Sequence, residues 1–268
     1  SRVKMAYIFF IGKKDVFLCA QRCVAHKEKF CDMSNPYFSF KRFTVWHDRC
    51  AMKAGTDSVI LGAYVSCDGV VRRILDVGAG CGILSLMMAQ RFPEAEITGV
   101  EIDVEAACQA RENAAASEWA GRIRMENCDF RLFEDECRFD LIVSNPPYFD
   151  NALVSPDGGR SVARHSVGLA YGELLAGASR LLAPQGKVWV IVPADAESAF
   201  CDCALDAGLL LTRRLGVVMK RGAAPKRAVL SFAKVACGYV DGTLAVREAD
   251  GSYTEEYRRL VSDFYKNM

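Results

Sequence analysis

Apolar and polar residues between positions 74 and 192 follow two periods in turn, which predicts strands that alternate with helices. Short continuous apolar runs are typical of buried strands, and apolar residues three or four positions apart are typical of helices. Strands are predicted at residues 74–77, 97–101, 123–128, 139–144 and 187–192. Helices are predicted at residues 83–91, 104–116, 171–182 and 194–207. This alternation implies a parallel sheet with helices on both faces.

The pattern changes near the C-terminus. Two strands at about residues 211–220 and 227–235 are separated by a loop too short for a crossover helix, so they form an antiparallel hairpin. Before the first strand, a helix is expected over residues 56–65, with Thr56 or Asp57 as its N-cap. The predicted fold is therefore α/β: a doubly wound, mostly parallel seven-stranded sheet with an antiparallel C-terminal hairpin.

The chain has 268 residues, 51% of them hydrophobic, which is enough for one large core. We predict an N-terminal extension over residues 1–36, where a short apolar run precedes Cys- and Lys-rich sequence, and one domain over residues 37–268. The extension contains residue types that bind zinc, at Cys19, Cys23, His26 and Cys31. Because the chain has no CxxC pair, we predict no metal site and interpret its 12 cysteines as reduced thiols.

The formal net charge of +1 excludes a general polyanion-binding protein. Basic residues are nevertheless concentrated between positions 209 and 234, where no acidic residue occurs. Such a stretch is either a nucleic-acid contact or a solvated face, and we predict Arg221, Lys226 and Arg227 as substrate contacts. No apolar run approaches the about 18 residues that span a membrane. We expect a cytoplasmic monomer with no membrane attachment and no obligate protein partner.

The first strand of the predicted sheet ends in a glycine-rich loop, which contains Gly78, Gly80 and Gly82. Ligands of doubly wound sheets bind at the carboxyl ends of the strands, and glycines there let the backbone approach a ligand closely. Asp76 precedes the loop, where a carboxylate can orient the glycine amides and face a cationic amino-acid group. A loop of this kind alone is a weak signal, because dinucleotide enzymes share it and a plain tight turn can also produce it.

Acidic residues at the ends of the next two strands narrow this choice. Glu101, followed by Ile102, ends the second strand, where a carboxylate can accept hydrogen bonds from both hydroxyls of a ribose. Asp129 and Phe130 follow the third strand and suit the amino group and the ring of adenine. The GxGxxG spacing of dinucleotide sites is absent, because Ile83 follows the last glycine. Together these residues predict a site for S-adenosylmethionine (SAM).

The fourth strand ends in the most specific motif of the chain, Asn145-Pro146-Pro147-Tyr148. The amino group of adenine and the amide of glutamine are poor nucleophiles, because the nitrogen lone pair is delocalised. The Asn145 side-chain oxygen and the Pro146 carbonyl can accept both hydrogens of such a group, and the two prolines fix the carbonyl. Asn145 is also a predicted cofactor contact. Tyr148 offers a ring for base stacking, and Pro147 and Phe149 are further predicted substrate contacts.

The spacing of Asp76 and the three glycines, together with residues 145–148, resembles that of amino methyltransferases acting on adenine-N6 or glutamine-N5. The stretch from Phe43 to Asp57 is similar to the bacterial enzymes that methylate adenine-N6 in valine tRNA, next to the anticodon. The resemblance covers about residues 37–268 and includes Pro225-Lys226-Arg227 and a helix over residues 253–265. It implies a class I SAM-dependent methyltransferase fold, a tRNA substrate, and Thr56 beside the methionine part of SAM. Cys81 departs from the usual threonine.

Two alternatives remain from the sequence. The same chemistry can act on the N5 of a protein glutamine or on another RNA or DNA base. Glutamine enzymes usually carry an extra N-terminal helical domain, and DNA enzymes a recognition domain, and this chain shows neither. A protein that binds SAM and RNA without catalysis is the other alternative, and the intact motif at 145–148 argues against it.

Overall fold

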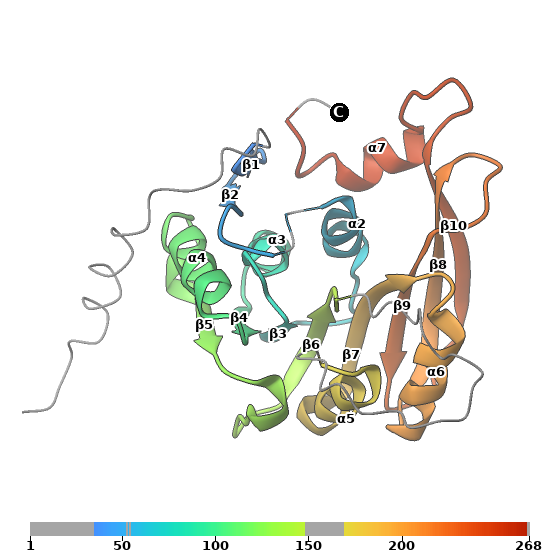
Figure 1. Cartoon of the computed structure of the whole chain (residues 1–268). Coiled ribbons are helices and arrows are strands. Elements are labelled where there is room, and N and C mark those ends of the chain that lie inside the picture. The colour runs from blue at the N-terminus through green and yellow to red at the C-terminus, as the bar shows by residue number, and fades with distance from the viewer. Residues whose placement is uncertain (1–34, 52, 54, 148–168, 267–268) are drawn as a thin grey trace, which may run out of the picture. The chain divides into compact units, whose positions relative to one another are not determined.

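One large sheet organises the chain (Figure 1). The computed structural model describes residues 35–51, 53, 55–147 and 169–266, and all of these except Asn35 belong to one compact unit, Pro36–Met268. The strands of the sheet are β3 (Arg73–Val77), β4 (Glu96–Glu101), β5 (Ile123–Asn127), β6 (Phe139–Ser144), β7 (Leu182–Pro193), β8 (Leu210–Lys220), β9 (Arg227–Ala233) and β10 (Val240–Arg247). They lie in the order β10-β8-β9-β7-β6-β3-β4-β5.

The strand directions agree with the prediction of a mostly parallel sheet. From β7 through β6, β3 and β4 to β5, all neighbours are parallel. Strand β9 is antiparallel to both β7 and β8, which confirms the C-terminal hairpin. The predicted count of seven strands is wrong, because β10 adds an eighth strand parallel to β8.

Strand β10 escaped prediction because its apolar signal is short. Its first half is polar and mostly exposed, at Asp241, Gly242 and Thr243, and only residues 244–246 are buried. As the last strand in the order, it lies at an edge of the sheet, and no strand of the described residues pairs with its outer side. A separate antiparallel pair, β1 (Tyr37–Ser39) and β2 (Thr44–Trp46), was not predicted either, because three residues are too few to show a period.

Helices cover both faces of the sheet, as a doubly wound fold requires (Figure 1). The helices are α2 (Thr56–Tyr64), α3 (Ile83–Arg91), α4 (Val104–Ala115), α5 (Tyr171–Leu181), α6 (Glu197–Asp206) and α7 (Glu255–Val261), with short 3-10 helices at Ala120–Arg122 and Phe130–Leu132. Helices α2, α3, α4 and α7 lie on one face, and α5 and α6 on the other. None of these described helices is long and apolar enough to cross a membrane.

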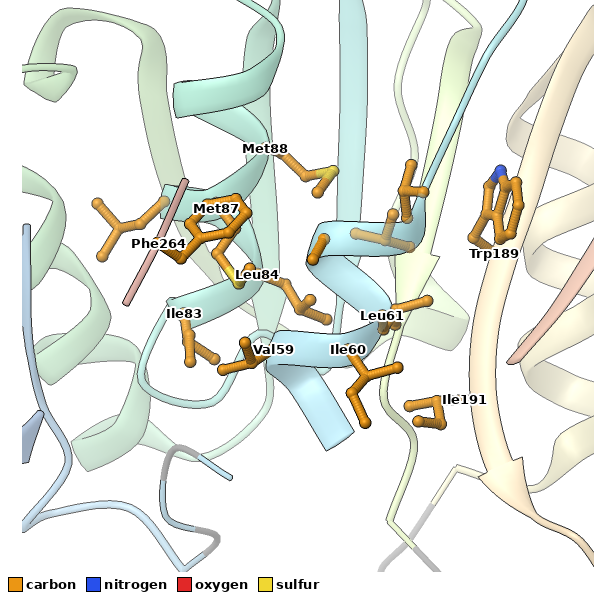
Figure 2. Packing of buried hydrophobic residues seen from close by; sticks show 14 of the residues in the cluster. Val59, Ile60, Leu61, Ile83, Leu84, Met87, Met88, Trp189, Ile191 and Phe264 are labelled. Carbon is orange, nitrogen blue, oxygen red and sulfur yellow. The ribbon is translucent and has the colours of Figure 1, made fainter. Parts of the chain in front are cut away.

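Helix α2 is the centre of the larger hydrophobic core. Its side chains pack toward α3 on one side and toward Trp189 and Ile191 of β7 on the other (Figure 2). Gly62 permits the close approach of α2 and α3, because a Cβ there would lie 2.6 Å from the Met87 sulfur. The N-cap of α2 is Gly55, so the predicted cap at Thr56 or Asp57 is wrong.

The strand register brings the predicted site residues to one edge of the sheet. Val77, the last residue of β3, lies opposite Val100 of β4 and Ser144 of β6. The glycine-rich loop, Glu101 and Asn145 therefore leave neighbouring parallel strands at the same carboxyl edge, where ligands of such sheets bind.

Candidate active site

A cavity of about 320 Å³ opens at this carboxyl edge, within the size range of ligand pockets. Its walls come from the ends of β3, β4, β5 and β6 and from the segment before α2. The predicted residues that line it are Gly78, Gly80, Glu101, Ile102, Asp129, Phe130, Asn145, Pro146 and Pro147. The structure thus brings together most of the predicted cofactor site and the described part of the predicted reacting site.

Backbone hydrogen bonds fix the glycine-rich loop against β4. The amides of Gly78 and Ala79 both donate to the carbonyl of Val100, at 2.9 and 3.1 Å. Gly82 has a φ of +80° and is the N-cap of α3. A Cβ at Gly82 would lie 3.3 Å from the Ala110 Cβ, so both the conformation and the packing favour glycine here.

Glu101 joins the loop to the cavity wall. One oxygen of its carboxylate accepts from the amide of Gly80 at 2.8 Å, and the other accepts from the amide of Asp103 at 2.9 Å. Each carboxylate oxygen has a second lone pair, so these bonds leave capacity to accept from a ligand hydroxyl. This geometry fits the predicted ribose contact, which stays a prediction.

Asp76 lies behind the cavity rather than on its wall. Its carboxylate is completely buried, and one oxygen accepts from the Ser85 hydroxyl of α3 at 2.7 Å. The other oxygen has no hydrogen-bond partner within the described chain. Burial raises the pKa of this carboxyl to about 7, the charge of Glu101 adds to the increase, and hydrogen bonds from Ser85 oppose it. The observed contact of Asp76 is therefore with α3, and the loop amides bond elsewhere.

Asp129 and Phe130 occupy the end of β5 as predicted. Asp129 accepts from the amide and the guanidinium of Arg131, and this hydrogen bonding lowers the pKa of its carboxyl. Phe130 is buried against α5, where a Cβ at Gly177 would lie 2.5 Å from its ring. These contacts hold the Asp129 carboxylate and the Phe130 ring in place beside the cavity.

Asn145 leaves the end of β6 with its side chain held in place. The Ser144 hydroxyl anchors the strand end by donating to the Val77 carbonyl at 2.8 Å. The Asn145 amide nitrogen donates to the Ser58 hydroxyl of α2 at 3.0 Å, which makes the amide oxygen the acceptor end of this group. Pro146 is buried and Pro147 is exposed, and both line the cavity. Tyr148 and Phe149 lie outside the described residues.

The remaining predicted contacts lie away from the cavity wall. Thr56 begins α2 and does not line this cavity, whereas Ser58, two residues later, does. Arg227 donates to the Asp57 carboxylate at 2.8 Å, and Arg221 forms ion pairs with Glu248 and Glu256. The structure does not test contacts with RNA, so Arg221, Lys226 and Arg227 remain predicted substrate contacts.

Two buried amides on α4, which the sequence analysis missed, support the cavity from behind. Gln109 accepts from the Arg49 amide and from the Cys50 thiol, and its own nitrogen donates to Asp48. Asn113 donates to the carbonyl of Cys81 in the glycine-rich loop at 2.8 Å and exchanges hydrogen bonds with the Trp46 backbone. The sequence contained one signal for this role: Gln109 and Asn113 are polar residues four positions apart in an alanine-rich helix, so they lie on the same side of it.

Among the described residues there is no group of three or more metal-binding side chains, and Cys19, Cys23, His26 and Cys31 lie outside those residues. The donor set of the cavity is instead backbone amides, carboxylates and one carboxamide. This set suits an uncharged or cationic organic ligand with hydroxyl and amino groups, as SAM is. Gly80, Glu101 and Asp129 are the residues that would hold the nucleoside part of SAM.

Comparison with known proteins agrees with this geometry. The model of the methyltransferase small domain family matches residues 57–201. A predicted O-methyltransferase of Agrobacterium tumefaciens has the same fold, with a TM-score of 0.60 at 20% identity over 80% of this chain and 100% of that one. Fold, cavity and family define a SAM-dependent methyltransferase of class I.

Relatives that match along their whole length identify the family within this class. A protein of Phocaeicola vulgatus is 47% identical over 236 residues, and one of Bacteroides thetaiotaomicron is 44% identical over 237 residues. Each match covers 88% of this chain and 100% of the relative, and both relatives are named tRNA1(Val) (adenine(37)-N6)-methyltransferase. The chain belongs to the family of these methyltransferases.

Proposed function

We propose that this enzyme transfers the methyl group of SAM to the N6 atom of adenine 37, next to the anticodon of a valine tRNA. The observation that carries the proposal is the position of Asn145. It lines the same cavity as the glycine-rich loop and Glu101, and Ser58 holds its amide nitrogen. The names of the full-length relatives support this substrate. A tRNA substrate also implies that the enzyme works in the cytoplasm.

The two acceptors at the end of β6 suit the amino group of adenine. The Asn145 oxygen and the Pro146 carbonyl can each accept one of its hydrogens, which favours a pyramidal nitrogen with an available lone pair. Pro146 and Pro147 restrict the backbone, so the carbonyl is positioned before the substrate binds. When bound, SAM supplies an electrophilic methyl group on a positively charged sulfur. The Asn145 and Pro146 oxygens also stabilise the positive charge that develops on the adenine nitrogen.

A defined RNA substrate tests this proposal. The enzyme would be incubated with SAM and an anticodon stem-loop of valine tRNA, followed by nucleoside mass spectrometry. We expect N6-methyladenosine from the stem-loop with adenosine at position 37. A matched stem-loop with guanosine at that position should yield none. Methylation at another nucleoside, or of a protein glutamine in place of RNA, would contradict the assignment.

A further inference from the structure

A second cavity, of about 500 Å³, has Thr56 in its lining, two residues before Ser58 in the lining of the cofactor cavity. Its lining includes Phe38 of β1, Arg247 at the end of β10, and Tyr253, Tyr257 and Tyr265 near the C-terminus. Strand β8 is antiparallel to β9, which is antiparallel to β7, so β8 and its parallel neighbour β10 have the same direction as β6. The end of β10 therefore lies on the same edge of the sheet as the cofactor cavity.

The lining of the second cavity combines aromatic rings with positive charge. Tyr253 stacks on Tyr257 with 5.3 Å between ring centroids, and Phe38 meets the ring of Tyr265 edge-on at 5.5 Å. The Arg247 guanidinium lies 4.1 Å from the centroid of the Tyr253 ring, and Lys266 also lines the cavity. None of the described lining residues is acidic. Rings and cations in this combination bind unpaired nucleotides, through base stacking and phosphate contacts.

The first turn of α2 lies between the two cavities. Thr56, the first residue of α2, lines the second cavity, and Ser58 lines the cofactor cavity and contacts Asn145. Residues two positions apart face nearly opposite sides of an α-helix, so the body of α2, about 10 Å across, separates the two cavities. The ion pair between Asp57 and Arg227 fixes this first turn against β9. A nucleic-acid strand with one base at Asn145 would place an adjacent nucleotide over the second cavity.

We propose that the second cavity binds a nucleotide next to the target adenosine in the substrate RNA. Its base stacks against Phe38 and the neighbouring tyrosines, and its phosphate faces Arg247 and Lys266. Phe38 is 37% exposed, so its ring is accessible to such a base. Burial raises the pKa of Tyr257 and Tyr265, so their hydroxyls stay uncharged beside a phosphate. This inference rests on the proposed RNA substrate, and it specifies the binding site of the nucleotide beside the target adenosine.

Substitutions of Phe38 test the stacking. Phe38→Ala should raise the KM for the anticodon stem-loop about 5- to 100-fold, the scale of one base–aromatic stack. The KM for SAM should stay within twofold, because Phe38 does not line the cofactor cavity. Phe38→Tyr should restore RNA binding and Phe38→Leu should not, since the ring face is what matters. Tyr239→Ala is the matched control, because Tyr239 is 55% exposed and outside both cavities.

A crosslinking experiment on the wild-type enzyme does not depend on the folding of any variant. Stem-loops with 5-iodouridine at position 36 or 38 would be irradiated in complex with the enzyme, and the crosslinked peptide identified by mass spectrometry. We expect one of them to crosslink to Phe38, Tyr253 or Tyr265. Crosslinks only at other residues, or an unchanged KM in folded Phe38→Ala, would overturn the assignment of the second cavity. The proposed function would still stand if the wild-type enzyme methylates position 37. Absence of methylation by the wild-type enzyme would refute the proposed function itself.

Discussion

The buried carboxyl of Asp76 should make the stability of the enzyme without SAM depend on pH. Its pKa is about 7 in the folded protein against the ordinary 3.8, mainly because burial disfavours the charged form. Below pH 4 the group is neutral in both states. Between pH 4 and 7 the folded state keeps a proton that the unfolded state has lost, so stability falls as the pH rises, and above pH 7 it levels off. The difference in pKa corresponds to about 4 kcal/mol.

Asp76→Asn removes this titration and isolates its effect. The free energy of unfolding would be measured by urea denaturation of both proteins, without SAM, at several pH values from 4 to 8. The stability of Asp76→Asn relative to wild type should increase with pH by up to about 4 kcal/mol and then level off near pH 7. The new side-chain amide lacks a hydrogen-bond partner on one side, and this costs the same free energy at every pH. The cost therefore shifts the plot of the stability difference against pH without changing its shape.

Ser144→Ala is the matched control for this measurement. It removes a buried hydroxyl from the adjacent strand, where Ser144 donates to the Val77 carbonyl, and introduces no titrating group. Its stability relative to wild type should therefore be the same at every pH. If the Asp76→Asn difference is equally flat, Asp76 ionises in the folded protein as it does in the unfolded chain, and the reasoning from its burial is refuted.

Three further predictions concern the cofactor loop and the RNA. Glu101→Ala should weaken SAM binding at least tenfold by calorimetry, because it removes the acceptor of the Gly80 amide and the predicted charge-assisted contact with the ribose; unchanged affinity of the folded variant would exclude that contact. Asn113→Ala should lower the free energy of urea unfolding by about 1–3 kcal/mol, since it leaves buried backbone groups unpaired, and a loss below that range would count against the support role. Lys226→Ala should lower the log–log salt slope of tRNA binding by about one, and Arg221→Ala by less, because Arg221 is already ion-paired; equal slopes would contradict this difference.

The sequence predicted the parts of the fold in which local pattern and long-range structure agree. Strand β6 and helix α3 have the predicted bounds, because each is mostly apolar and has a clear boundary: α3 begins after Gly82, and β6 ends just before Asn145-Pro146. The glycine-rich loop, Glu101 and Asn145 converge because parallel strands must end at one edge. Strand β10 was missed because half of its residues are polar and exposed.

Contacts between distant segments could not be predicted from local pattern. The bond between Asn145 and Ser58 joins residues 87 positions apart, and nothing near Ser58 in the sequence points to β6. The ion pair of Arg227 with Asp57 spans 170 positions. The sequence showed a basic stretch at residues 209–234. The acidic partners of Arg221 lie after that stretch, so counting its charges did not reveal them. The order and direction of the strands and helices decide which of these residues come into contact.

The most direct test of the account is the methyl-transfer rate of Asn145→Ala at saturating SAM and tRNA. In the proposed mechanism, the Asn145 oxygen accepts a hydrogen bond from the amino group of the target adenine. The rate should therefore fall about 100- to 1000-fold, as on removal of one preorganised polar group. The SAM dissociation constant should stay within a few-fold, because Gly80, Glu101 and Asp129 remain in place. A folded Asn145→Ala enzyme that methylates tRNA at the wild-type rate would contradict the account.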